Sequence, residues 1–220
     1  MSTLDRISDA QQNDPNELLE VFTSKGSPTG AAKPRAAIHR AGDWHLAFHC
    51  WVLRRGGQEV VLQQRSLLKD TFPGCWDAAA AGHWRFGESP AEAAREIGEE
   101  LGIEVAFDRL VYRGRERSLR QRMPNGLIDR EWHEVYVLHD DRPLSEYRPD
   151  VREVIGLAAF NVADVLALAS SRLAGGNARE AYTVNDDGSL TGSAVAVSRA
   201  DLVPYSAARL RRTLGSGYTY

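Results

Sequence analysis

The chain has 220 residues, 43% of them hydrophobic and 26% charged, which is the composition of a globular protein long enough to bury a sizeable core. Its formal net charge of −3 gives no general attraction to nucleic acid or to an anionic membrane surface, so neither is expected as a partner. Two cysteines, Cys50 and Cys75, are too few for a disulfide scaffold, and we expect a cytoplasmic protein with free thiols.

No segment predicts export or a membrane span. The first twenty residues are polar and lack the apolar stretch of a signal peptide, so residues 1–20 are expected to form a flexible N-terminus. The apolar run over residues 154–170 is interrupted by Asp164, and it is not expected to cross a bilayer.

The first predicted elements are β-strands. Residues 18–39 indicate a short strand, a turn at 25–28 and an extended arm. Residues 45–65 contain two β-rich runs joined by the two glycines at 56–57, which is the pattern of a hairpin. Residues 67–82 indicate a loop followed by a short strand of small residues.

A helix is predicted next, from Ser89 to Gly102. Ser89 is a good N-cap, Pro90 suits the first turn, and Glu92 completes a capping box. Gly102 is a typical helix stop. Gly98, in the interior, costs about 1 kcal/mol relative to alanine, which predicts little room for a side chain there.

Strands and helices alternate again beyond this helix, and the whole order predicts an α+β domain with a mixed sheet covered by helices. The domain is expected to span residues 21–172, including an N-terminal β arm, and residues 173–220 are expected to be a C-terminal extension packed on it. The remaining predicted elements are strands over 103–122, 127–140 and 153–160, a turn at Pro124-Asn125-Gly126, a helix over 162–171 capped by Asn161, and a C-terminal helix over 203–214.

Four glutamates share one side of the predicted helix. At about 100° per residue, Glu96, Glu99 and Glu100 lie within roughly 80° of Glu92, and the apolar residues face the other way. One interpretation is a solvated acidic face paired with arginines. The other is a site for a hard divalent cation, which prefers oxygen ligands and offsets the repulsion between carboxylates.

A resemblance favours the cation. The segment GHWRFGESPAEAAREIGEELGI, residues 82–103, resembles the Nudix box of the Nudix hydrolase superfamily. In that box Gly, five residues and Glu are followed by seven residues and Arg-Glu-aliphatic-x-Glu-Glu-x-Gly-aliphatic. Gly82 and Glu88 have this spacing and residues 95–103 match the second half, but six residues rather than seven separate Glu88 from Arg95. The resemblance implies a Nudix fold, with a mixed β-sheet sandwiched between helices.

The resemblance also implies the chemistry of the site. A Nudix hydrolase binds Mg²⁺ or Mn²⁺ and cleaves a diphosphate linkage, and Glu99 or Glu134 is expected to take the proton of the attacking water. Arg95 is expected to pair with a box glutamate and to hold the helix against the preceding loop. The metal ligands implied by the match are Glu96, Glu99, Glu100 and Gly82.

Segments outside the box resemble the branch of the superfamily related to isopentenyl diphosphate isomerase. The segments are HLAFHCWVL, LQQRSLLKDTFPGCWDAAAAGH and REWHEVYVL, at residues 45–53, 62–83 and 130–138. The isomerase has a catalytic cysteine two residues before the box histidine, where this chain has Ala81. Proton transfer to and from carbon needs paired acid and base groups, so hydrolysis is favoured over isomerisation.

The same branch directs attention to further polar residues. His45, His83 and the pair Glu131/Glu134 stand where metal-binding or substrate-binding groups of the isomerase would be expected. If the even-numbered face of the strand over 127–140 lines the pocket, Glu134 supplies the fourth carboxylate. Trp132 then offers a platform for an apolar or base moiety, unless it belongs to the core.

The strand after the helix is rich in arginine. Arg113 and its neighbours could bind diphosphate oxygens through guanidinium forks, but a solvated edge strand explains the same pattern.

The sequence therefore predicts a cytoplasmic, metal-dependent Nudix hydrolase acting on a small-molecule diphosphate, either an isoprenoid diphosphate or a nucleoside diphosphate derivative. Two alternatives stay open, an isopentenyl diphosphate isomerase and a diphosphate-binding Nudix sensor without turnover. The oligomeric state, a homodimer included, is left open.

Overall fold

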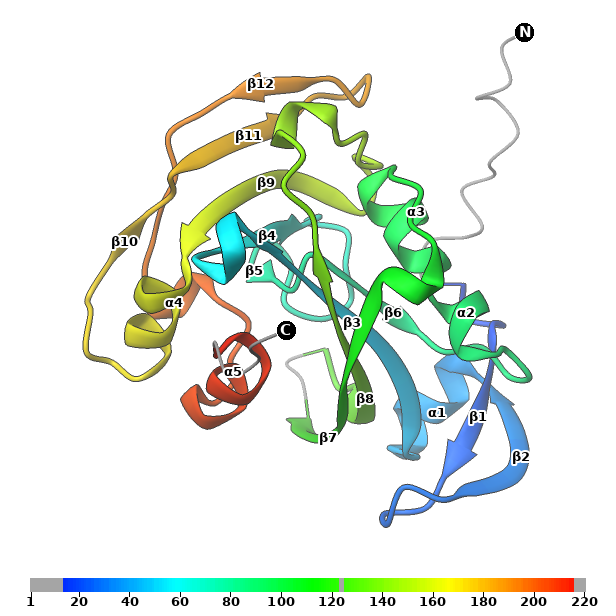
Figure 1. Ribbon diagram of the computed structural model, residues 1–220. Helices are drawn as coiled ribbons and strands as arrows, with labels where there is room; N and C mark the ends of the chain where they lie inside the picture. The colour runs from blue at the N-terminus through cyan, green and yellow to red at the C-terminus, as the bar shows by residue number, and fades with distance from the viewer. Residues whose placement is uncertain (1–13, 123–124, 216–220) are drawn as a thin grey trace, which may run out of the picture.

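The computed structural model describes residues 14–122 and 125–215, and it places helices on both faces of a large mixed sheet (Figure 1). The strands of the sheet are β3 (His45–Arg54), β4 (Glu59–Arg65), β5 (Trp76–Asp77), β6 (Ala80–His83), β7 (Leu110–Arg122), β8 (Ile128–His139), β9 (Val154–Asn161), β11 (Glu180–Val184) and β12 (Leu190–Gly192). Their order is β12-β11-β9-β4-β3-β8-β7, with β5 beside β4 and β6 beside β3. Strands β3 and β8 run parallel, so the sheet is mixed, as predicted.

The side chains of β3 divide the core into two layers. Phe48 and Val52 belong to one apolar cluster, and Trp51 and Leu53 belong to the other. All ten residues of β3 are buried, as expected of a strand covered on both faces. The first face carries α2 (Pro90–Ala93) and α3 (Arg95–Leu101), and the second carries α4 (Val162–Ala169) and α5 (Ala207–Leu214) (Figure 1).

The N-terminal arm is partly helical. Strand β1 (Leu18–Phe22) is the predicted short strand, and β2 (Pro28–Pro34), after the predicted turn, pairs with it antiparallel. The extended arm expected after the turn is present as far as Pro34, but its last part is wrong, because α1 (Arg35–Ala41) follows directly. Alanines inside this stretch favour a helix, and Gly42, at φ 69°, ends it in the left-handed conformation.

The predicted box helix is interrupted once. Its cap is as expected, with Ser89 and Glu92 forming a capping box, and Gly102 ends it at φ 63°. At Ala94, however, ψ is −7°, and the amide of Ile97 donates to the Ala94 carbonyl at 3.1 Å, an i to i+3 contact. This tight turn between α2 and α3 accommodates the shortened spacing of the box.

Gly98 has more room than its sequence position predicts. A Cβ built on Gly98 would meet nothing closer than the Ile103 carbonyl oxygen at 3.8 Å, apart from the helix's own backbone. We therefore expect Gly98→Ala to stabilise the fold by about 1 kcal/mol. Urea unfolding of both proteins measures this change, and a destabilised variant would contradict the account.

The C-terminal extension contributes more than a packed helix. Within residues 173–220, β11 pairs with β9 and β12 with β11, so part of the segment completes the main sheet. A separate pair is formed by β10 (Gly176–Asn177) and β13 (Ala196–Val197). In the predicted turn between β7 and β8, Pro124 lies outside the described residues, and the two strands pair antiparallel.

Candidate active site

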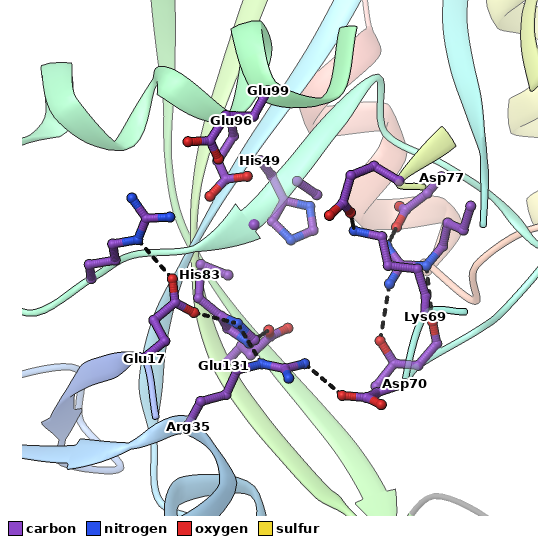
Figure 2. Close-up of a pocket in the computed structure, with 17 residues that line it drawn as sticks. Glu17, Arg35, His49, Lys69, Asp70, Asp77, His83, Glu96, Glu99 and Glu131 are labelled. Carbon is purple, nitrogen blue, oxygen red and sulfur yellow. Dashed lines mark hydrogen bonds and ion pairs between the residues drawn. The ribbon is translucent and has the colours of Figure 1, made fainter. Parts of the chain in front are cut away.

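A pocket opens where β3, β6 and β8 lie side by side next to α3 (Figure 2). Glu96 and Glu99 enter it from α3, and Glu131 of β8 lies across from them. The other ionisable side chains that line the pocket are Glu17, Arg35, His49, Arg65, Lys69, Asp70, Asp77, His83, Arg85 and Glu153. Such a charged lining suits a charged, phosphorylated ligand more than an apolar one.

Glu96 is a buried carboxylate of this pocket. Its side chain is 11% exposed and forms an ion pair with Arg95. Burial outweighs that pairing and raises the pKa of Glu96 to about 8. A Cβ built on Gly82 would overlap with the Glu96 carboxylate, so the glycine provides the space that this carboxylate occupies.

Arg95 ties the two ends of the box together. Its guanidinium donates to Glu88 at 2.8 Å, to Glu99 at 2.7 Å and to the His83 carbonyl at 3.2 Å, besides its contact with Glu96. The expected pairing of Arg95 with box glutamates is therefore present. It holds α3 against the preceding loop despite the shortened spacing.

Glu100 is separated from the other box carboxylates. It is 1% exposed and is not among the lining residues. Its oxygens accept hydrogen bonds from the Ala81 amide at 2.8 Å, from Gln63 at 2.7 Å and from Lys69 at 3.2 Å. These contacts support Glu100 as a brace for the pocket wall in β6 rather than as a ligand that faces the pocket.

Three histidines cluster beside the pocket, and one of them, His83, lines it. The rings of His39, His45 and His83 have centroids 5.0 to 5.1 Å apart. Nε2 of His83 lies 3.7 Å from Glu131 Oε1, and Nε2 of His45 lies 3.8 Å from the same oxygen. The structure thus brings together His45 and His83, both singled out in the sequence, with Glu131 and with His39.

This cluster fits a divalent metal ion. His45 Nδ1 donates to the Asp43 carbonyl at 3.1 Å, while the buried Nε2 has no hydrogen-bond partner among the described residues. Burial lowers the pKa of His39 to about 4 and that of His83 well below its usual range. Neutral imidazoles oriented by a second hydrogen bond are the form in which histidine binds metals.

The face of β8 that lines the pocket is the odd-numbered one. Glu131 lines it, whereas Glu134 accepts a hydrogen bond from Tyr112 at 2.6 Å and pairs with Arg115. The arrangement that would place Glu134 in the pocket is therefore wrong. Strand β8 runs parallel to β3 with His45 beside Glu131, and this register brings the odd-numbered residues to the histidines.

Two further predicted substrate contacts lie outside the pocket. The Trp132 ring packs on Trp44, with 5.4 Å between centroids, and its Nε1 donates to the Thr23 carbonyl at 3.1 Å. This is the core role weighed for Trp132 in the sequence. Arg113 is on the edge strand β7 and is not among the lining residues.

Cationic residues that the sequence did not single out line the pocket instead. Arg65 pairs with Asp77 at 3.0 Å, and Arg35 pairs with Asp70 at 2.9 Å. Lys69 lies between carboxylates of α3 and of the loop before β9. His39 could have been found from its position six residues before His45, at the end of a stretch of good helix formers. No comparable signal marks Arg35, Arg65 or Lys69.

Binding of a divalent ion is expected to strengthen with pH. At pH 6 the Glu96 carboxyl holds a proton that a cation must displace, because its pKa is about 8. The apparent affinity for Mn²⁺ should rise about tenfold per pH unit up to about pH 8 and then level off. His39 adds nothing to this slope, because its pKa of about 4 keeps it neutral throughout.

Isothermal titration calorimetry with Mn²⁺ at several pH values between about 6 and 9 measures this slope. Glu96→Gln removes the titrating group, so the residual affinity of this variant for Mn²⁺ should not change over the same pH range. A wild-type affinity that is flat over this range would contradict the assignment.

The NUDIX domain family matches residues 43–180 of this chain. The chain belongs to the Nudix family. An uncharacterised Nudix hydrolase of Clostridium acetobutylicum is 31% identical over 192 residues, which cover 86% of this chain and 91% of that protein. The predicted family is thus confirmed, and with it the assignment of this Nudix protein as a hydrolase.

Two other comparisons bear on branch and fold. The isopentenyl-diphosphate Δ-isomerase of Streptomyces avermitilis is 36% identical over 151 residues, 68% of this chain and 73% of that enzyme. The crystal structure of DR0079 from Deinococcus radiodurans has a TM-score of 0.52 and 22% identity, covering 70% of this chain and 90% of that one. The Nudix fold is therefore confirmed. In the described part of the chain, every helix is too short or too polar to span a bilayer.

Proposed function

We propose that this Nudix protein is a Mg²⁺- or Mn²⁺-dependent hydrolase of a diphosphate linkage in a small molecule. The observation that carries the proposal is the composition of one pocket. Glu96 and Glu99 of the box, His83 and Glu131 of the neighbouring histidine cluster and cationic side chains line it, while Ala81 stands at the position of the isomerase cysteine.

Two sets of side chains would bind cations. Glu96 and Glu99, with the Gly82 backbone, would hold a hard cation through oxygen, and His39, His45, His83 and Glu131 offer a second set of donors. A bound cation supplies positive charge that offsets the phosphate oxygens and acidifies an attacking water.

Glu99 is the general base that we propose. Its side chain is 45% exposed and lines the pocket, so water can reach it, and Arg95 holds it at 2.7 Å. The other residue considered from sequence, Glu134, is engaged with Tyr112 and Arg115 away from the pocket.

The cations of the pocket would orient the diphosphate. Arg35, Arg65, Lys69 and Arg85 all line the pocket, and Lys69 and Glu131 lie on opposite sides of it (Figure 2). Guanidinium groups suit phosphate oxygens through paired hydrogen bonds. On binding, these cationic side chains would exchange their present carboxylate partners for the phosphate oxygens of the ligand.

Isomerisation is the second candidate, favoured by the identity to the Streptomyces isomerase. It needs an acid or base at the wall of the pocket where Ala81 lies. Cys75 packs against the second apolar cluster and is not among the described lining residues. The wall therefore offers no thiol at that point, and hydrolysis is the better supported reaction.

Phosphorus NMR distinguishes these reactions. The protein with Mg²⁺ is incubated separately with isopentenyl diphosphate, ADP-ribose, a nucleoside diphosphate sugar and CDP, each beside Glu96→Gln. Conversion of a diphosphate signal by wild type alone supports the hydrolase and names the substrate class. Interconversion of prenyl diphosphates without phosphate release would support the isomerase, and Mg²⁺-dependent line broadening without conversion would support a binding protein.

A further inference from the structure

The C-terminal helix contacts the strand that carries Glu131 through one arginine. We propose that Arg209 of α5 is a positioning residue that fixes the tautomer of His133 and, through it, the orientation of Glu131. This inference rests on the proposed function, in which Glu131 faces the bound ligand. It gives the C-terminal extension a role in the site.

The hydrogen-bond chemistry of the chain of contacts permits one tautomer. Nη2 of Arg209 lies 2.5 Å from His133 Nδ1, and His133 Nε2 lies 2.7 Å from Glu131 Oε2. A guanidinium can only donate, so Nδ1 accepts, and the ring proton is on Nε2. Nε2 therefore donates to the Glu131 carboxylate.

This bond determines which oxygen of Glu131 faces the histidine cluster. Oε2 is held by His133, and Oε1 is the atom near His45 and His83, at 3.8 and 3.7 Å. Carboxylates that bind metals are commonly held by an outer hydrogen bond of this kind. With the opposite tautomer, Nε2 would present a lone pair to the carboxylate and repel it.

Arg209 is itself held firmly. It is 8% exposed, pairs with Glu116 at 2.5 Å and lies over the Tyr205 ring at 4.5 Å. Glu116 is the cross-strand neighbour of His133 in the β7–β8 pair, so the ion pair with Glu116 places Arg209 beside His133. Arg212, one turn further on, also pairs with Glu116 at 3.0 Å, but its side chain is 66% exposed.

Arg212 offers a matched control. Arg209→Gln and Arg212→Gln remove the same charge from the same helix and from the same glutamate, and only Arg209 contacts His133. Since each variant leaves Glu116 one arginine, both are expected to fold.

Nitrogen NMR of the histidine rings in the metal-free proteins tests the tautomer directly. Wild type and Arg212→Gln should show His133 as the Nε2–H form, and Arg209→Gln a mixture of both forms. A Nδ1–H form in the wild type would overturn the inference even if the variants failed to fold. An unchanged Nε2–H form in Arg209→Gln would overturn it equally.

The effect on the site is measured by Mn²⁺ titration. Arg209→Gln should weaken Mn²⁺ binding about tenfold, the lower end of outer-shell effects, and Arg212→Gln should not. In a His133→Gln background, whose amide donates to Glu131 without a choice of tautomer, Arg209→Gln should add less than about twofold, the scatter of independent sites. A full tenfold loss in that background would show a merely structural role and overturn the inference.

The two proposals fail in different ways. If wild type bound no Mn²⁺ and converted no diphosphate while the tautomer shifted as expected, the proposed function would be overturned and the Arg209–His133 contact would stand. If wild type bound Mn²⁺ and both arginine variants behaved alike, the positioning role would be overturned and the hydrolase would stand.

Discussion

Replacing Glu96 with glutamine is expected to lower kcat about 1,000-fold with little change in KM. Glutamine has nearly the same shape but carries no charge, so the pocket loses a buried carboxylate of the box. A cation that stabilises developing charge contributes several kcal/mol, and about 4 kcal/mol corresponds to 1,000-fold in rate. Steady-state kinetics with the substrate found by phosphorus NMR measures the loss.

The variant should fold as well as the wild type. The folded pKa of Glu96, about 8, lies above its ordinary value of 4.5. In the metal-free wild type the unfolded chain therefore loses this proton first, and stability falls as pH rises from about 4.5 through about 8. Glutamine imitates the protonated form, so the melting temperature of Glu96→Gln at pH 8 should equal or exceed that of the wild type.

Glu92→Gln is the matched control. Glu92 lies one turn earlier, is exposed and is not among the lining residues, and glutamine can keep its capping contact with Ser89. Its kcat should stay within about twofold of the wild type, as for substitutions remote from the site. An equal loss in both variants, or full activity in Glu96→Gln, would remove Glu96 from the catalytic site.

Local signals were sufficient to predict the box and its helix caps. Ser89, Glu92 and Gly102 act within a few residues of one another, so the sequence contains all the partners that decide these caps. The break at Ala94 was not predicted. The shortened spacing of the box shows that the backbone must differ from the usual box, but not at which residue.

The choice between Glu131 and Glu134 could not be made locally. Alternation places the two residues on opposite faces of β8, but which face lines the pocket depends on pairing with β3, some 85 positions earlier in the chain. Arg65 and Lys69 reach the pocket from the end of β4 and from the loop after it, and His39 reaches the histidine cluster from α1. No periodic pattern in these short segments marks a functional side chain.

Replacing Gly82 with alanine is expected to remove activity while leaving the fold nearly intact. A Cβ at this position would overlap with the Glu96 carboxylate and with no nearer group. The end of a flexible side chain can swing away at small cost, so the methyl group should displace Glu96 rather than β6. Because Glu96 would then leave its place beside Arg95, we expect kcat to fall at least about 100-fold, as when a preorganised charge is lost, and Mn²⁺ binding to weaken.

Gly192→Ala provides the control, because a Cβ there meets nothing within 4 Å and Gly192 is exposed in β12. The two variants should melt within a few degrees of each other, a difference of about 1 kcal/mol, and differ widely in kcat. If Gly82→Ala kept its activity, Glu96 could not need its present position for the reaction. If Gly82→Ala unfolded, the added methyl group would have displaced strand β6 rather than the Glu96 carboxylate. Glu96→Gln would then show by itself whether the reaction needs the charge of Glu96.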